Sequence, residues 1–127
     1  MKTDIQNRED IILLVNTFYD KVQKDEELGH IFNGVAKIDW QAHLPKMYDF
    51  WENIVFGTGG YSGNVMQPHM RLDQKHRLEH DNFVNWLMLF TSTVNELFEG
   101  VNAEGVKERA TQIAGLMEFK VASVRKE

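Results

Sequence analysis

Apolar residues recur at intervals of three and four along every long segment of this chain, and no segment sustains an alternation of apolar and polar residues. Spacing of three and four places apolar side chains on one face of an α-helix, whereas alternation would place them on one face of a β-strand. The chain has 127 residues, the usual size of one domain. We therefore expect a single all-α domain over residues 1–127, with five or so helices.

The first half of the chain contains three of these helices. Residues 8–24 are expected to form the first helix, with Asn7 as its N-cap. A short second helix is expected over residues 25–32, closed by the pair Asn33-Gly34. A third begins after Asp39, although Pro45 in its second turn predicts a late start or a bend. The buried face of the first helix is predicted to be Ile11, Leu14, Val15, Phe18, Tyr19 and Val22.

The second half contains two longer helices. One is expected to be capped near Asp81 and to stop at Gly100, and the last covers about residues 103–124. Between the third and fourth helices, residues 57–80 form a loop of about 24 residues, longer than the roughly 2–8 residues that usually join two helices. Loops of this length within compact domains are usually functional or disordered. This one carries apolar residues, so we expect it to pack against another part of the protein.

The composition excludes several classes of protein. The chain has no cysteine, which excludes disulfides, thiolate metal sites and a c-type haem attachment. Its net charge is −5 and no cluster of Lys and Arg forms a stripe, so nucleic acid is not an expected partner. No apolar run approaches the roughly 20 residues of a membrane span, and the N-terminus resembles no signal or transit peptide. A soluble cytoplasmic protein is the expectation.

Two local patterns have ordinary explanations that outweigh the functional ones. The glycine-rich "GTGGYSG" at 57–63 lacks the Lys and Ser/Thr of a phosphate-binding loop and follows a helix, so a turn explains it better. His76 and His80, four residues apart, could share a metal on a helix. No third ligand is evident, and solvated side chains are the preferred interpretation.

Four polar side-chain ends stand out on apolar segments: Tyr19, His43, His69 and Trp86. They come from different segments of the chain, and together they indicate an apolar pocket with a few directed hydrogen-bonding groups. A flat apolar cofactor with one metal fits such a pocket, because a single neutral imidazole can hold haem iron. The alternative is an ordinary aromatic core without a cofactor.

Five motifs resemble the truncated haemoglobins, the shortened globins whose helices form a two-over-two sandwich around a haem. The resemblance is closest to group III, because the double glycine of groups I and II near the first helix junction is missing. The motifs run in order over most of the chain and are "FYDKV" at 18–22, "LGHIF" at 28–32, "DWQAHLPKMYDFW" at 39–51, "YSGNVMQPH" at 61–69 and "FVNWLMLF" at 83–90.

The resemblance implies a role for each of the four polar side chains. His69 matches the proximal ligand of the haem iron, with His76 as a rival because the spacing from His69 to Trp86 is longer than in some relatives. Tyr19 and Trp86 match the distal donors to a bound ligand. His43 matches the distal histidine, which either contacts the ligand or controls its access.

The resemblance also implies which side chains line the pocket. Phe32 matches the aromatic residue that packs on the face of the haem. The other expected lining residues are Met47, Phe50, Trp51, Leu72 and Phe83.

The function implied is that of a haem b protein that binds O2, NO or CO at a five-coordinate iron. Two distal donors suit tight oxygen binding or redox chemistry on O2 and NO better than oxygen transport. Nitric oxide dioxygenation or peroxidase-type turnover could use the same residues, and each would need a reductase or another electron source. The alternatives are a six-coordinate electron-transfer haem protein, with Met47 or His43 as second ligand, and a helical interaction module without haem.

The haem hypothesis is tested by the absorption spectrum of the purified protein, ferric and then reduced with and without carbon monoxide. The His69→Ala variant is measured in the same way. We expect a strong haem band that shifts with carbon monoxide and is lost or altered in the variant. A normal spectrum in His69→Ala would make His76 the ligand. Failure of the wild type to take up haem, even on reconstitution, would favour the interaction module.

Overall fold

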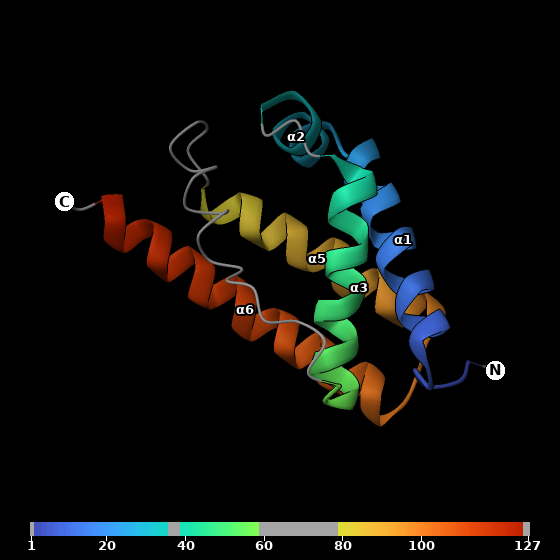
Figure 1. The fold of residues 1–127 in the computed structure, drawn as a ribbon. Helices are drawn as coiled ribbons and strands as arrows, with labels where there is room; N and C mark the ends of the chain where they lie inside the picture. Colours follow the sequence, from blue (N-terminus) through green and yellow to red (C-terminus); the bar gives the residue numbers. More distant parts are fainter. Residues whose placement is uncertain (1, 36–38, 59–78, 126–127) are drawn as a thin grey trace.

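The computed structural model describes residues 2–35, 39–58 and 79–125 (Figure 1). All regular structure within these ranges is helical, as the apolar spacing predicted. None of the helices in these ranges is long and apolar enough to cross a membrane. The elements are α1 (Arg8–Lys24), α2 (Glu26–Gly29), the π-helix η1 (His30–Val35), α3 (Trp40–Phe56), α5 (His80–Leu97) and α6 (Val101–Arg125).

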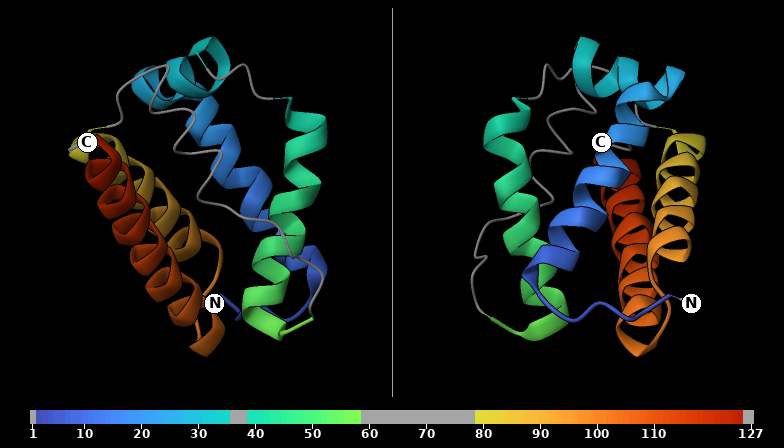
Figure 2. Two further views of the ribbon diagram at one scale, coloured as in Figure 1. Left: turned by 60° about the vertical axis from the view of Figure 1, so that its left-hand side comes forward. Right: turned by 90° about the vertical axis from the view of Figure 1, so that its right-hand side faces the viewer.

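The four long helices form two pairs. α1 packs beside α3, and α5 packs beside α6 (Figure 2). α1 also packs on α5, so the two pairs face each other as two layers. The short α2 and η1 lie at one end, against α1, and α2 also contacts α5. The interface between the layers is therefore the place where a core or a pocket can form.

The first helix agrees closely with its prediction. The side-chain oxygen of Asn7 accepts a hydrogen bond of 3.0 Å from the backbone N–H of Asp10, which confirms Asn7 as the N-cap. All six apolar residues predicted for the inner face of α1 are buried. A regular amphipathic spacing and a strong cap point to the same helix, which explains why its bounds were predictable.

The second helix does not stop where the sequence predicted. After Gly29 the chain continues as a π-helix to Val35, through the pair Asn33-Gly34 that was expected to close it. A glycine that ends a helix usually takes the left-handed conformation. Among the described glycines only Gly57 and Gly100 have positive φ, so Gly34 is not such a stop.

Pro45 does not delay the third helix. Asp39 is its N-cap and α3 begins at Trp40, with the N–H of His43 donating to the Asp39 carbonyl over 2.9 Å. Pro45 has no N–H to donate and its ring crowds the carbonyl four residues earlier, yet α3 continues past it to Phe56. Gly57 ends α3 in the left-handed conformation, with φ of 66°.

The fourth long segment starts close to the expected position near Asp81. Glu79, not Asp81, is the N-cap of α5, and the Asn82 side-chain oxygen accepts a 2.7 Å hydrogen bond from the Glu79 N–H. Asp81 lies in the first turn, where its negative charge interacts favourably with the positive end of the helix dipole. α5 ends at Leu97, and α6 begins at Val101, two residues before the predicted start.

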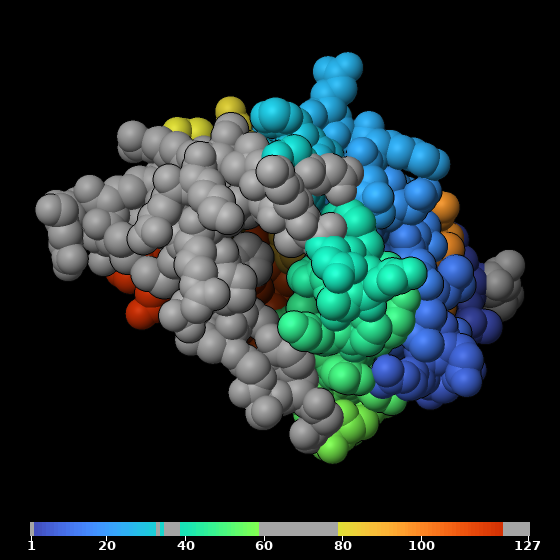
Figure 3. All heavy atoms as spheres, turned by 45° about the horizontal axis from the view of Figure 1, so that its top comes forward, coloured from blue at the N-terminus to red at the C-terminus, as the bar shows by residue number. Residues whose placement is uncertain are grey.

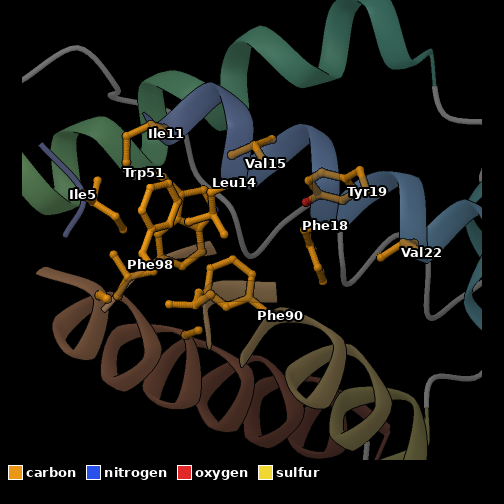
Figure 4. Packing of buried hydrophobic residues seen from close by; sticks show 14 of the residues in the cluster. Ile5, Ile11, Leu14, Val15, Phe18, Tyr19, Val22, Trp51, Phe90 and Phe98 are labelled. Atoms are coloured by element: carbon orange, nitrogen blue, oxygen red, sulfur yellow. The ribbon is translucent and has the colours of Figure 1, made fainter. Parts of the chain in front are cut away.

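Several aromatic rings belong to the buried cluster between the two helix layers (Figure 4). Phe90 of α5 is fully buried; its ring stacks on Trp51 of α3, with centroids 4.8 Å apart, and meets the edge of Phe18 at 5.1 Å. Burying side chains of this size contributes about 1.5–3 kcal/mol each. Phe90 therefore joins α1, α3 and α5 at one point.

The N-terminal segment caps the last helix from a distance. Gly100 precedes α6 and has no side chain to serve as a cap, and the Asp4 carboxylate takes that place. It accepts hydrogen bonds of 2.9 Å from the N–H groups of Asn102 and Ala103. A Cβ on Gly100 would lie 2.4 Å from the Asp4 side chain, and the φ of 148° also favours glycine.

Asp4→Ala should therefore lower the free energy of unfolding by about 1–2 kcal/mol, the usual range for loss of an N-cap. Burial alone would raise the pKa of the Asp4 carboxyl. Hydrogen bonds from the backbone N–H groups of Asn102, Ala103 and Ile5 outweigh that effect, so the pKa lies below its ordinary 3.8. A carboxyl whose folded pKa is depressed stabilises the protein above its unfolded pKa and loses that effect as the pH falls through the folded pKa. Urea unfolding of wild type and variant should thus differ at neutral pH and converge in acid.

Asp20→Ala is the matched control, since Asp20 is an exposed α1 carboxylate whose ion pair, among the described residues, is with Lys24 one turn away. Its loss should change the free energy of unfolding by less than about 0.5 kcal/mol. An Asp4→Ala effect no larger than that of Asp20→Ala would contradict the capping role.

Candidate functional site

Three of the four polar side chains singled out in the sequence lie around one region between the layers. Tyr19 comes from α1, His43 from α3 and Trp86 from α5. The Tyr19 and His43 ring centroids are 5.6 Å apart, and the Phe18 ring touches both Tyr19, at 4.8 Å, and Trp86, at 5.5 Å. His69, the fourth, lies outside the described residues.

The Tyr19 hydroxyl has no hydrogen-bond partner within the described ranges, although the residue is only 6% exposed. Within the described residues, this hydroxyl is therefore a hydrogen-bond donor whose acceptor is not supplied by the protein. Burial raises the pKa of Tyr19, so its hydroxyl keeps its proton and can donate a hydrogen bond.

The Trp86 indole is held by two phenylalanines. Its plane lies within 8° of the Phe90 plane, with centroids 5.6 Å apart, and is perpendicular to Phe18, at 89°. The indole N–H makes no hydrogen bond to any residue of the described parts of the chain. A half-buried Trp usually finds an acceptor for this N–H. Trp86 is thus a second donor with a fixed ring and an acceptor still to be supplied.

His43 is half-buried, as expected for a histidine on the inner face of α3. Its ring stands almost perpendicular to Tyr19, at 83°, and to Trp40, at 77°. Trp40 also contacts Tyr19 at 5.2 Å and Phe32 at 6.2 Å. Trp40 is a site residue that the sequence reasoning left out, although its position three residues before His43 on the same helix was a usable signal.

The predicted lining residues divide into two groups. Phe32, Met47, Phe50 and Phe83 are half-buried and pack against the edge of the core, where each keeps apolar surface to cover. Trp51 is 3% exposed, and its ring is already stacked on Phe90. Leu72 lies outside the described residues.

His80, one of the two histidines that could have shared a metal, is described by its contact with α6. His80 begins α5, and its Nδ1 lies 2.7 Å from a carboxylate oxygen of Glu118 on α6, with the His80 side chain largely exposed. His76 lies outside the described ranges.

The described residues fit a haem on its distal side. A flat apolar cofactor needs apolar and aromatic walls, and a ligand bound to it needs nearby donors. The half-buried aromatic residues and Met47 supply the walls, and Tyr19 and Trp86 supply an O–H and an N–H that have no acceptor within residues 2–35, 39–58 and 79–125.

The comparisons with known proteins agree with this geometry. The family model described as bacterial-like globin matches residues 4–121. The chain is 33% identical over 117 residues to group 3 truncated hemoglobin ctb of Campylobacter jejuni, and the match covers 90% of each chain. The crystal structure of group III truncated hemoglobin from the same species matches with a TM-score of 0.81 and 31% identity over 95% of each chain.

This chain belongs to the bacterial-like globin family, and within it to the group III truncated haemoglobins. The truncated globin fold and the group III resemblance predicted from its motifs are confirmed. It is a haem-containing globin that binds oxygen and other diatomic ligands.

Tyr19→Phe should not destabilise the ferrous protein in the absence of a gas ligand. The hydroxyl has no partner to lose, so we expect the free energy of unfolding to fall by less than about 0.5 kcal/mol or to rise. Tyr48→Phe is the control, because the Tyr48 hydroxyl donates to the Asn16 side chain over 2.5 Å and its removal deletes a real bond. A loss above about 1 kcal/mol in Tyr19→Phe would show a structural bond to the hydroxyl.

Proposed function

We propose that this globin retains oxygen through hydrogen bonds from Tyr19 and Trp86, in a five-coordinate haem b pocket with His69 as the proximal ligand. One observation carries the proposal: two donors, from α1 and α5, are both in ring contact with Phe18 and have no acceptor in the parts of the chain that the structure describes. Non-covalent haem b is favoured because the chain has no cysteine for a thioether link.

The haem supplies an iron that takes up the diatomic ligand, and the chain's own residues decide how firmly the ligand is kept. The Tyr19 hydroxyl stays protonated because burial raises its pKa, and it donates to the ligand from the α1 side. The Trp86 N–H donates from the α5 side, with its ring plane fixed by Phe90. Neither donor has to break another hydrogen bond within the described residues first, so little reorganisation opposes the contact.

The expected strength of these bonds favours retention over transport. A hydrogen bond to a charged or partly charged acceptor contributes about 1.5–3 kcal/mol. That corresponds to roughly tenfold to over a hundredfold slower release. We propose that such a protein binds oxygen tightly or supports redox chemistry on O2 and NO, with electrons supplied by a reductase.

A second axial ligand from His43 is the competing arrangement. The two edge-to-face contacts of His43, with Tyr19 and Trp40, favour a ring that belongs to the distal wall instead. A five-coordinate spectrum of the ferrous protein without added ligand is the expected result. A six-coordinate spectrum that reverts in His43→Ala would favour the electron-transfer alternative.

Tyr19→Phe and Trp86→Phe should each speed oxygen release, by about tenfold or more, because each removes one donor to the ligand. The measurement is the oxygen dissociation rate after rapid mixing with carbon monoxide. Tyr48→Phe, the same substitution at a tyrosine that bonds Asn16, is the control and should release oxygen like the wild type. Unchanged rates in both pocket variants would refute the proposal.

A further inference from the structure

Three rings from two helices are in mutual contact on the distal side. Tyr19, Trp40 and His43 have pairwise centroid separations of 5.2, 5.6 and 5.7 Å. Each ring therefore touches the other two. Phe32 of η1 adds a contact to Trp40 alone, at 6.2 Å.

The position of Trp40 follows from helix geometry. Trp40 is the first residue of α3 and His43 lies three residues later, so the two side chains share a face. Side chains in a helix lean toward its N-terminus, which directs His43 over the turn that carries Trp40. The α3 chain reaches the surface beside α2 (Figure 3). Trp40 is half-buried, whereas Tyr19 is the most buried of the three rings.

The ring angles indicate what Trp40 does. His43 meets Tyr19 at 83° and Trp40 at 77°, and edge-to-face contacts of this kind are favourable and depend on orientation. Turning the imidazole away from Tyr19 would break its contact with that ring and change its contact with Trp40. Without the indole, one of these two orienting contacts is lost and space opens beside His43.

We propose that Trp40 is a positioning residue that holds the His43 imidazole against Tyr19 and thereby sets the opening of the distal side to entering ligands. The inference rests on the proposed function, because it assigns the distal side to the region of Tyr19 and His43. Trp40 acts through His43 and not by contact with the ligand. Because Trp40 also contacts Tyr19 directly, its removal should have a clearly larger effect when His43 is present than when His43 is absent.

A double-mutant cycle tests this dependence. Trp40→Leu, His43→Ala and the double variant are compared with the wild type by the association rate of carbon monoxide after flash photolysis. The infrared stretch of carbon monoxide bound in the pocket is the second measurement, because it reports the arrangement of the distal side chains. Phe56→Leu, at the opposite end of α3 and 38% exposed, is the control for removing an aromatic ring from this helix.

Trp40→Leu should change the association rate by about threefold to tenfold, the range that loss of one aromatic pair gives. It should also shift or split the infrared band. Trp40→Phe, which keeps a ring, should restore most of the wild-type behaviour. In the His43→Ala background, Trp40→Leu should have a clearly smaller effect, limited to the loss of the direct Trp40–Tyr19 contact. Phe56→Leu should match the wild type in both measurements.

Two results would overturn the inference: wild-type behaviour in Trp40→Leu, or an effect of equal size with and without His43. If Trp40→Leu fails to fold, by urea unfolding, Trp40→Met fills the space without a ring and takes its place in the cycle. Failure here is distinct from failure of the proposed function, which depends on oxygen release in Tyr19→Phe and Trp86→Phe. If those variants release oxygen quickly but the Trp40 and His43 effects are additive, the proposed function stands and only the positioning role of Trp40 is refuted.

Discussion

The Phe18 ring is the contact on which the two layers and the distal donors both depend. It is 1% exposed and meets Tyr19, Trp86 and Phe90 edge-on, at 61°, 89° and 84°. Edge-to-face contacts have a preferred geometry, unlike general apolar burial, so one ring fixes the orientation of three others. The same side chain that joins α1 to α5 in the core therefore also orients two hydrogen-bond donors at its edge.

This arrangement explains how the protein keeps two donors without acceptors near its core. An unmet buried polar group costs about 1–3 kcal/mol, so a fold usually pairs such groups internally. Here the walls are rigid rings, and no hydrogen-bonding side chain among the described residues reaches the Tyr19 oxygen or the Trp86 nitrogen. The ion pairs are placed elsewhere: Arg8 bridges to Asp49 and Glu52 on α3, at the surface, where such pairs contribute little. The polar groups of the pocket thus stay available to a ligand.

The sequence was informative wherever the signal was local and repeated. The inner face of α1 was predicted residue by residue, because six apolar positions and one cap point to one helix. The end of the second helix was not predicted. Asn33-Gly34 is a local stop signal, but the segment also packs against α1 and α2, and such tertiary contacts can override local preference. The Asp4 cap of α6 could not be found either, because a contact between residues about a hundred positions apart leaves no periodic trace. In the site, the motifs selected Tyr19, His43 and Trp86, but ring angles and the part of Trp40 required three dimensions.

The π-helix connects the unpredicted part of the fold to the site. η1 has a wider turn than the α2 segment before it, so its side chains are rotated relative to a continuous α-helix. Phe32 lies on this wide turn, and its ring faces Trp40, at 6.2 Å. Irregular helical turns of this kind cost backbone energy and tend to occur at functional sites. In this globin the π-helix carries an aromatic side chain that contacts Trp40, so the first turn of α3 is in ring contact with both η1 and α1.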